Sequence, residues 1–162
     1  MIGNKKTKKT ANKALVRPIL EYAATVWDPY TENEISSAEK VQRRAARWVS
    51  NRHRKISCNI MDSLEWPTLQ QHHRKARLEM FFKFHHGLIS ISSSYLPRPT
   101  SSRRSSRKNN DYSYDIPSCR TQYRQMSFSP RTLPDWNSLP QEIVAADTLD
   151  CFKSRLNSYL KQ

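Results

Sequence analysis

Every strong hydrophobic periodicity in this 162-residue chain has the three- and four-residue spacing of an α-helix. The apolar stripes are Leu15, Ile19, Tyr22 and Val26; Ile35, Ala38, Val41, Ala45 and Trp48; Leu69, His73, Ala76, Met80 and Phe84, extended by Phe81 and Leu88; and Leu149, Phe152, Leu156 and Leu160. A brief further helix is expected around residues 60–64. The sequence therefore predicts a mainly α fold, a small bundle of four to five helices without an extended sheet.

Several residues predict where these helices begin and end. Thr31 followed three positions later by Glu34 fits a capping box, and Gly87 offers a carboxy-terminal cap. Pro18 would clash with a preceding helical turn, so the first helix either kinks there or starts with Pro18 in its first turn. Pro67 suits the first turn of the third stripe's helix.

Composition divides the chain into four parts. Residues 1–10 are predicted to be a disordered, lysine-rich arm, and residues 11–90 a helical core. Residues 91–125 have the composition of a long, flexible, basic Ser/Arg-rich loop. Residues 126–162 are expected to form a proline-framed plug followed by the last helix.

Three prolines, at positions 130, 134 and 140, frame the plug and limit it to extended or turn structure. Its apolar side chains are expected to fill gaps against the helices; they are Phe128, Leu133, Trp136 and Leu139. Tryptophan is largely buried in most proteins, so we expect structural roles for Trp27, Trp48, Trp66 and Trp136. The alternative for an exposed indole is to stack on a nucleic-acid base.

Lysine and arginine outnumber aspartate and glutamate by 28 to 14, giving a formal charge of +14. A surplus of this size indicates a polyanionic partner, with nucleic acid ahead of an anionic membrane surface. The basic residues are clustered in residues 5–9, 43–55 and 103–108. The alternative is a solvated surface without a dedicated ligand.

The second stripe's helix has a basic face opposite its apolar one. Arg43, Arg44 and Arg47 lie three and four residues apart, so they share a neighbourhood that could follow a phosphate backbone. The alternative is a solvated face in which these arginines pair with acids such as Glu39.

Several functional classes are excluded by the sequence. The three cysteines are widely spaced, which argues against a disulfide framework, and no apolar run approaches the roughly 20 residues of a membrane span. Two glycines are too few for a phosphate-binding glycine-rich loop. The histidine doublets at 72–73 and 85–86 lack the spacing of metal ligands. We therefore expect no cofactor, no metal site and no membrane insertion.

Four blocks of sequence, in order, resemble the reverse transcriptases of non-LTR retrotransposons, the jockey-like LINE elements. The blocks are LVRPILEYA at 15–23, VQRRAAR at 41–47, LEWPTL at 64–69 and SFSPRTLPDWNSLP at 127–140. The resemblance places the chain downstream of the polymerase core, in the region that includes the helical thumb. It implies a thumb-like core over residues 11–90 that grips a nucleic-acid duplex.

The resemblance also implies where nucleic acid binds and what is missing. Arg17, Arg43, Arg44 and Arg47 match basic positions of its motifs, and the neighbouring basic residues Arg52, Arg54 and Lys55 complete the expected binding set. Members of the family hold two metal ions with aspartates, including those of a Tyr-x-Asp-Asp turn. This chain has no Asp-Asp pair. The prediction is a non-catalytic segment that binds RNA or DNA, duplex or hybrid, without sequence specificity.

Two other hypotheses remain. The chain could be a helical protein-interaction module that associates with a partner or with itself through apolar helix faces. It could also be the product of a decayed element with no retained function. The lysine run at 5–9 resembles a nuclear import signal, so the expected location is intracellular, with the nucleus as one option.

Overall fold

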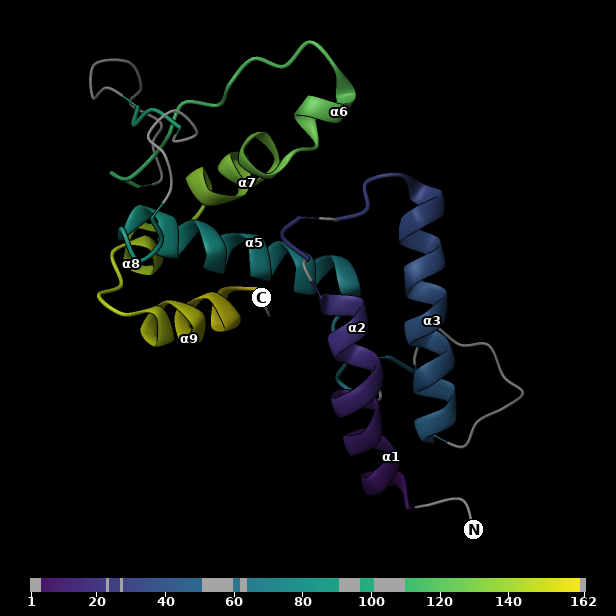
Figure 1. Ribbon diagram of the computed structural model, residues 1–162. Helices are drawn as coiled ribbons and strands as arrows, with labels where there is room; N and C mark the ends of the chain where they lie inside the picture. The colour runs from purple at the N-terminus through teal and green to yellow at the C-terminus, as the bar shows by residue number, and fades with distance from the viewer. Residues whose placement is uncertain are drawn as a thin grey trace. The chain divides into compact units, whose positions relative to one another are not determined.

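The computed structural model describes residues 4–22, 24–26, 28–50, 60–61, 64–90, 97–100 and 110–160. These residues are mainly helical, which confirms the predicted fold class (Figure 1). Within them there is no strand beyond one antiparallel bridge between Pro99 and Tyr114. The chain divides into two compact units, Met1–Arg74 and Lys75–Gln162.

The first unit opens with one continuous helical run. It consists of α1 (Lys5–Ala11), a π-helical turn η1 (Asn12–Val16) and α2 (Arg17–Glu21). Pro18 lies in the first turn of α2, but the helical run does not start there, because α1 and η1 precede it without a break. Because proline has no N–H and its ring crowds the preceding turn, the wider π turn just before it keeps the helix continuous.

The prediction of a disordered arm over residues 1–10 is wrong from Lys5 onward, because α1 forms there and packs against α3 (Glu32–Ser50). Lys8 is only 3% exposed: its Nζ donates a hydrogen bond to the backbone oxygen of Trp48 at 3.3 Å and lies 5.4 Å from the centroid of the indole. The apolar stem of a lysine can be buried in this way while its ammonium is satisfied.

The apolar stripe predicted for this run faces solvent instead of the core. Leu15, Ile19, Tyr22 and Val26 are between 68% and 85% exposed. The inward positions follow a four-residue spacing; they are Lys8, Asn12, Val16 and Leu20. A π turn accommodates more residues than an α turn, so positions on either side of it do not follow one 3.6-residue repeat.

Helix α3 (Glu32–Ser50) begins where the capping signal predicted. The Glu34 N–H donates to Thr31 Oγ1 at 3.4 Å. The buried face of α3, however, is rotated around the helix from the predicted one; it consists of Glu39, Gln42, Ala46 and Val49. Two residues of the predicted stripe, Val41 and Trp48, are exposed instead.

Hydrogen bonds offset part of the cost of burying the two polar residues on α3, although Gln42 Oε1 has no partner among the described residues. Glu39 Oε1 accepts from the Leu69 N–H at 2.8 Å, and Gln42 Nε2 donates to the Pro67 carbonyl at 2.9 Å. A buried polar group that is hydrogen-bonded avoids most of its desolvation cost. Both bonds fix the start of the next helix against α3.

Helix α5 (Leu69–His85) starts with a reciprocal cap that the sequence analysis missed. The Gln71 N–H donates to Thr68 Oγ1 at 3.2 Å, and the Thr68 N–H donates to Gln71 Oε1 at 3.0 Å. Pro67 therefore lies before the helix and not in its first turn. The helix ends at His85, and Gly87 caps its carboxy terminus as predicted, with a φ of 65° that suits glycine.

Alanine in place of Glu39 is expected to destabilise the protein by about 1–3 kcal/mol, because the Leu69 N–H loses its partner and the amino terminus of α5 loses a carboxylate. Urea unfolding followed by circular dichroism measures the loss. Glutamine at 39 should recover part of the stability, and alanine in place of the exposed Glu34 should cost clearly less. Equal effects at positions 34 and 39 would contradict the proposed role.

The second unit is built around one hydrophobic core. Besides the remainder of α5, its helices are α6 (Gln122–Gln125), α7 (Phe128–Asn137), α8 (Gln141–Val144) and α9 (Leu149–Tyr159). The core residues are Leu78, Phe81, Phe82, Leu133, Trp136, Leu139, Ile143, Val144, Ala146, Phe152 and Leu156. The stripe predicted for the last helix is confirmed, with Phe152 and Leu156 fully buried.

The plug is buried as predicted, but its extended conformation is wrong, because residues 128–137 form α7. Pro130 lies in the first turn, where backbone N–H groups need no helical partner. Pro134 lies inside the helix, which nevertheless continues, since Leu133 and Trp136 on either side are fully buried. The burial of both side chains offsets the cost of the proline.

Part of the predicted flexible loop is also packed. Residues 91–96 and 101–109 of that loop lie outside the described residues. Asn110, in contrast, is buried, and its Nδ2 donates to the carbonyls of Trp136 at 3.2 Å and Leu139 at 3.0 Å. Because a helix end leaves carbonyls unpaired, this amide stabilises the carboxy terminus of α7 and anchors residues 110–114.

Candidate nucleic-acid interface

The most basic part of the first unit is formed by two helices that contact each other. We call α1 and the carboxy-terminal half of α3, residues 40–50, the basic helix pair. Residues 5–11 and 40–50 together carry eight lysines and arginines and no acidic residue. The Lys8 to Trp48 hydrogen bond and ring contact join the two helices.

The arginines of α3 lie where a phosphate backbone could reach them. Arg43 and Arg44 are exposed and Arg47 is half-buried. At about 100° per residue, Arg44 lies opposite the buried face, with Arg43 and Arg47 beside it. Within the described residues, none of the three has an ion-pair partner, and Glu39, proposed above as a partner, binds the Leu69 N–H instead.

Lysines of α1 and of the η1 turn that follows it form a second exposed row, which the sequence analysis missed because it assigned residues 1–10 to a disordered arm. Lys6, Lys9 and Lys13 are all exposed. Their three- and four-residue spacing was the available signal, since such positions are neighbours on a helix. The helix converts a flexible charge cluster into a fixed one.

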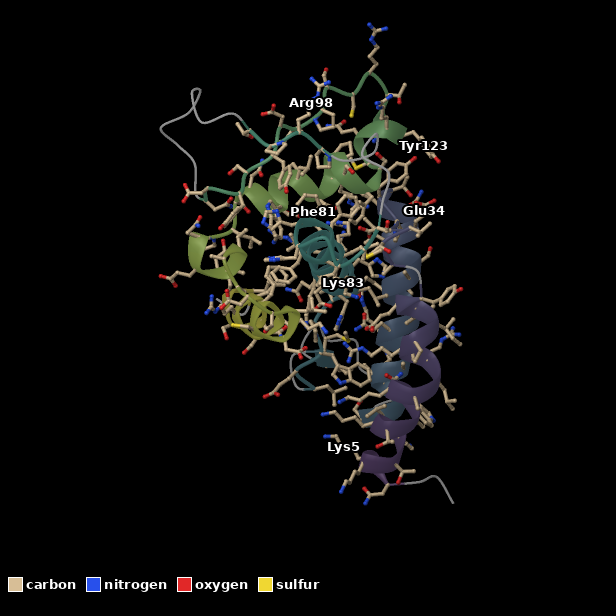
Figure 2. All side chains as sticks on the ribbon, turned by 60° about the vertical axis from the view of Figure 1, so that its left-hand side comes forward. Lys5, Glu34, Phe81, Lys83, Arg98 and Tyr123 are labelled. Atoms are coloured by element: carbon tan, nitrogen blue, oxygen red, sulfur yellow. The ribbon has the colours of Figure 1, made fainter. Side chains whose placement is uncertain are left out.

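Charge is separated along the two helices. Glu32 and Glu34 lie in the first turn of α3, where carboxylates interact favourably with the helix dipole. The basic residues lie at the other end, as the positions of Glu34 and Lys5 in Figure 2 show. An anionic ligand is therefore attracted to the end of the first unit that holds α1.

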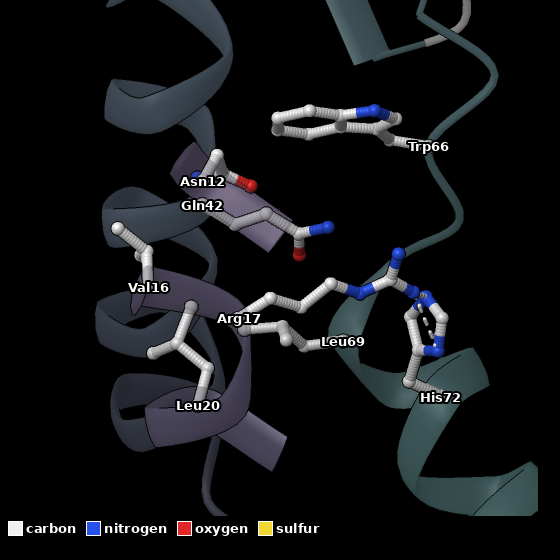
Figure 3. A pocket seen from close by; sticks show the side chains of 8 residues that line it. All are labelled: Asn12, Val16, Arg17, Leu20, Gln42, Trp66, Leu69 and His72. Carbon is white, nitrogen blue, oxygen red and sulfur yellow. Dashed lines mark hydrogen bonds between the residues drawn. The ribbon is translucent and has the colours of Figure 1, made fainter. Parts of the chain in front are cut away.

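Arg17 does not belong to this surface, although its motif position predicted a nucleic-acid contact. Its Nε donates to Glu21 Oε1 at 2.6 Å. Its Nη2 contacts both ring nitrogens of His72 (Figure 3). Because the guanidinium already has a carboxylate and an imidazole as partners, we assign Arg17 a structural role. Arg52, Arg54 and Lys55 lie outside the described residues.

The pocket beside Arg17 is too small for a ligand. It is lined by Asn12, Val16, Arg17, Leu20, Gln42, Trp66, Leu69 and His72 (Figure 3). The cavity measures about 10 Å³, which is at most the space of one water molecule. It is a packing defect where α2, α3 and α5 meet.

The tryptophans divide between core and surface. Trp136 is fully buried and Trp66 half-buried, as predicted, whereas Trp27 lies outside the described residues. Trp48 is 42% exposed, so the expectation of burial is wrong there. Its neighbours Ala46 and Val49 take the buried positions, which leaves the indole on the basic side of α3.

The titratable groups of the second unit hold its fold together. Arg77 Nη2 donates to Asp135 Oδ2 at 3.2 Å. Burial lowers the pKa of Arg77, as does the nearby Arg131, while Asp135 opposes that change. His85 Nδ1 is 2.7 Å from the Tyr114 hydroxyl, and burial, followed by the charge of His86, lowers the pKa of His85.

This lowered pKa predicts a pH dependence of stability. Below the ordinary histidine pKa of about 6.5, the unfolded chain binds a proton that the folded chain resists, so the free energy of unfolding falls as the pH falls through that range. We expect lower urea midpoints at about pH 5.5 than at about pH 7.5. Replacing His85 by glutamine should flatten this dependence more than replacing the exposed His86 does.

Among the described residues, no helix combines the length and the apolar character that a membrane crossing requires. In the same part of the chain, no group of three His, Cys, Asp or Glu side chains is placed to hold a metal ion. No protein-family model, curated protein or solved structure matches this chain.

Proposed function

We propose that the basic helix pair binds the phosphate backbone of RNA or DNA, duplex or hybrid, without sequence specificity and without catalysis. The observation that carries the proposal is the concentration of exposed basic side chains on two helices that contact each other, in ranges (5–11 and 40–50) that contain no acidic residue. Phosphate contacts supply affinity and position but no sequence information.

The local order of these helices favours binding over a merely solvated surface. Lysines on a disordered arm would attract a polyanion, but each would lose conformational freedom on binding. In α1 the backbone is already helical, and Lys8 fixes the helix to α3. The entropy lost on binding is correspondingly smaller.

The resemblance to the thumb region of non-LTR retrotransposon reverse transcriptases supports the same proposal from the sequence. A thumb contributes grip and no chemistry, so the proposal requires no catalytic aspartates. Two of the aspartates in fact contact basic partners: Asp28 Oδ1 is 2.9 Å from His73 Nδ1, and Asp135 accepts from Arg77.

Salt dependence tests the proposal. Fluorescence anisotropy with a labelled RNA–DNA hybrid should show that the logarithm of the binding constant falls linearly with the logarithm of the salt concentration. The slope should be about −3 or steeper, since each neutralised phosphate contributes nearly −0.9. Hybrids of unrelated sequence should bind equally well. Binding that is insensitive to salt, or specific to one sequence, would contradict the proposal.

A second candidate function rests on a different observation. The exposed apolar side chains Leu15, Ile19, Tyr22 and Val26 are the kind of surface that a protein-interaction module would present. Hydrophobic association should persist at high salt, where phosphate binding is lost. Light scattering at about 1 M salt should then show an association that Leu15→Ser with Ile19→Ser abolishes.

A further inference from the structure

An indole lies at the seam of the basic helix pair. Trp48 is in the last full turn of α3, and 42% of its surface is exposed. The core positions of this turn are taken by Ala46 and Val49, both fully buried. A tryptophan is an unusual choice for a surface position, because most of its area is apolar and is normally buried.

Lys8 holds this indole from the α1 side. Its ammonium lies over the ring, 5.4 Å from the centroid, and donates to the backbone oxygen of the same residue at 3.3 Å. Since Lys8 itself is only 3% exposed, the contact covers one side of the ring and restricts its rotation. Trp48 is nevertheless 42% exposed, so the Lys8 contact holds the side chain in place and leaves much of the residue accessible before any ligand binds.

Basic side chains border the exposed ring. Arg44 precedes Trp48 by one turn and lies only about 40° from it around the helix. Arg47 and Lys40 lie further round the same outward side, about 80° to 100° from Trp48. A nucleotide whose base rests on the indole would thus have cationic groups within reach of its own and neighbouring phosphates.

Stacking discriminates between paired and unpaired bases. An exposed aromatic ring binds any base, because every base has a π-face, and this contact is the usual source of affinity for single strands. In a blunt duplex the base faces are stacked on one another, so only phosphates are accessible to the helices. Trp48 can therefore add affinity for single strands while the charges attract both forms.

We propose that Trp48 is a stacking platform for an unpaired base, and that the basic helix pair consequently binds single-stranded nucleic acid in addition to duplex backbones. The inference rests on the proposed function and names a substrate class for the same surface. Arg44 and Arg47, which lie on the same outward side of α3, contact phosphates next to the stacked nucleotide.

Two substitutions test the platform. Anisotropy titrations use a labelled oligothymidylate of about 15 nucleotides and a blunt DNA duplex of about 15 base pairs; variants are compared at one low salt concentration, and the unaltered chain is also titrated over a salt series. Trp48→Leu should weaken oligothymidylate binding roughly 5- to 150-fold, the effect of losing one base–aromatic stack, and change duplex binding less than about twofold. Trp48→Phe, which keeps an aromatic ring, should retain most of the single-strand affinity.

Intrinsic fluorescence supplies a readout that a merely structural role would not move. Oligothymidylate should quench the tryptophan emission of the unaltered chain, and Trp48→Phe should remove most of that quenching while still binding. Far-UV circular dichroism and urea midpoints of both variants verify that α3 remains folded.

The outcomes separate this inference from the proposed function. If both probes bind with steep salt dependence but Trp48→Leu weakens them equally, or weakens neither, the platform is wrong and the backbone-binding surface stands. If the unaltered chain binds neither probe, both proposals are overturned. Quenching that survives in Trp48→Phe would also exclude stacking at this residue.

Discussion

Replacing Trp136 by alanine is expected to reduce the free energy of unfolding by about 3–5 kcal/mol, the largest loss we expect from any single substitution in the chain. The indole is fully buried and lies 4.8 Å from Phe81 and 6.0 Å from Phe152, between ring centroids. Its Nε1 also donates to the Tyr112 carbonyl at 2.9 Å. The substitution thus opens a cavity and removes an anchor of residues 110–114.

Trp48→Ala is the matched control, because the same atoms are removed from a position that is 42% exposed. Its cost should be markedly smaller, since the surrounding solvent fills the space that the ring leaves. Urea unfolding followed by circular dichroism measures both variants. If Trp136→Ala cost no more than Trp48→Ala, the hydrophobic core described for the second unit would be wrong.

Features specified by neighbouring residues were predictable from the sequence. The cap at Thr31 needs only an oxygen near the first turn, and Gly87 needs only its freedom to adopt a positive φ. The stripe of α9 was also correct, because Phe152 and Leu156 lie on a short regular helix without competing polar contacts. In each case the signal and the structure lie within a few residues of each other.

The orientation of α3 could not be derived in that way. Glu39 and Gln42 are buried because Leu69 and Pro67 supply partners about 30 and 25 residues further along the chain. Hydropathy assigns such polar residues to the surface, so the predicted buried face of α3 left out Glu39 and Gln42 and was rotated from the observed one. A buried polar side chain is favourable only when its partner is known, and that partner is a tertiary contact.

The same reasoning applies to α1 and α7. Order in the lysine-rich arm depends on Lys8 finding the Trp48 carbonyl and ring, forty positions away. The helical conformation of residues 128–137 depends on the burial of Leu133 and Trp136, which outweighs the local effect of Pro134. Propensity alone predicted disorder in the first case and extended structure in the second.

For the candidate site, the sequence predicted the exposed arginines of α3 but neither the partners of Arg17 nor the exposure of Trp48. Charge and helical spacing suffice to place Arg43, Arg44 and Arg47 together. Whether an arginine is available to a ligand depends on its partners, and Arg17 is held by Glu21 and His72. The sequence offered no sign of that second interaction.

Removing the three arginines of α3 is expected to have the largest effect on binding. Glutamine at positions 43, 44 and 47 should reduce the salt slope for an RNA–DNA hybrid by about 2 to 3 units, at nearly one unit for each phosphate that the variant no longer neutralises. Glutamine at positions 6, 9 and 13 should reduce it comparably if the α1 row binds the same backbone. Helicity should stay unchanged in both variants, because all six side chains are exposed or half-buried.

A third variant separates a local surface from the net charge. Glutamine in place of the exposed Arg98, Arg120 and Arg124 removes the same three charges from the second unit. Because only charges that neutralise a phosphate contribute to the slope, binding confined to the basic helix pair predicts nearly the original slope for this variant. If the slope fell equally in all three variants, the whole cationic chain would attract nucleic acid non-locally. If it fell only in the lysine variant, the binding surface would be α1 alone, and α3 would serve to hold α1 in place.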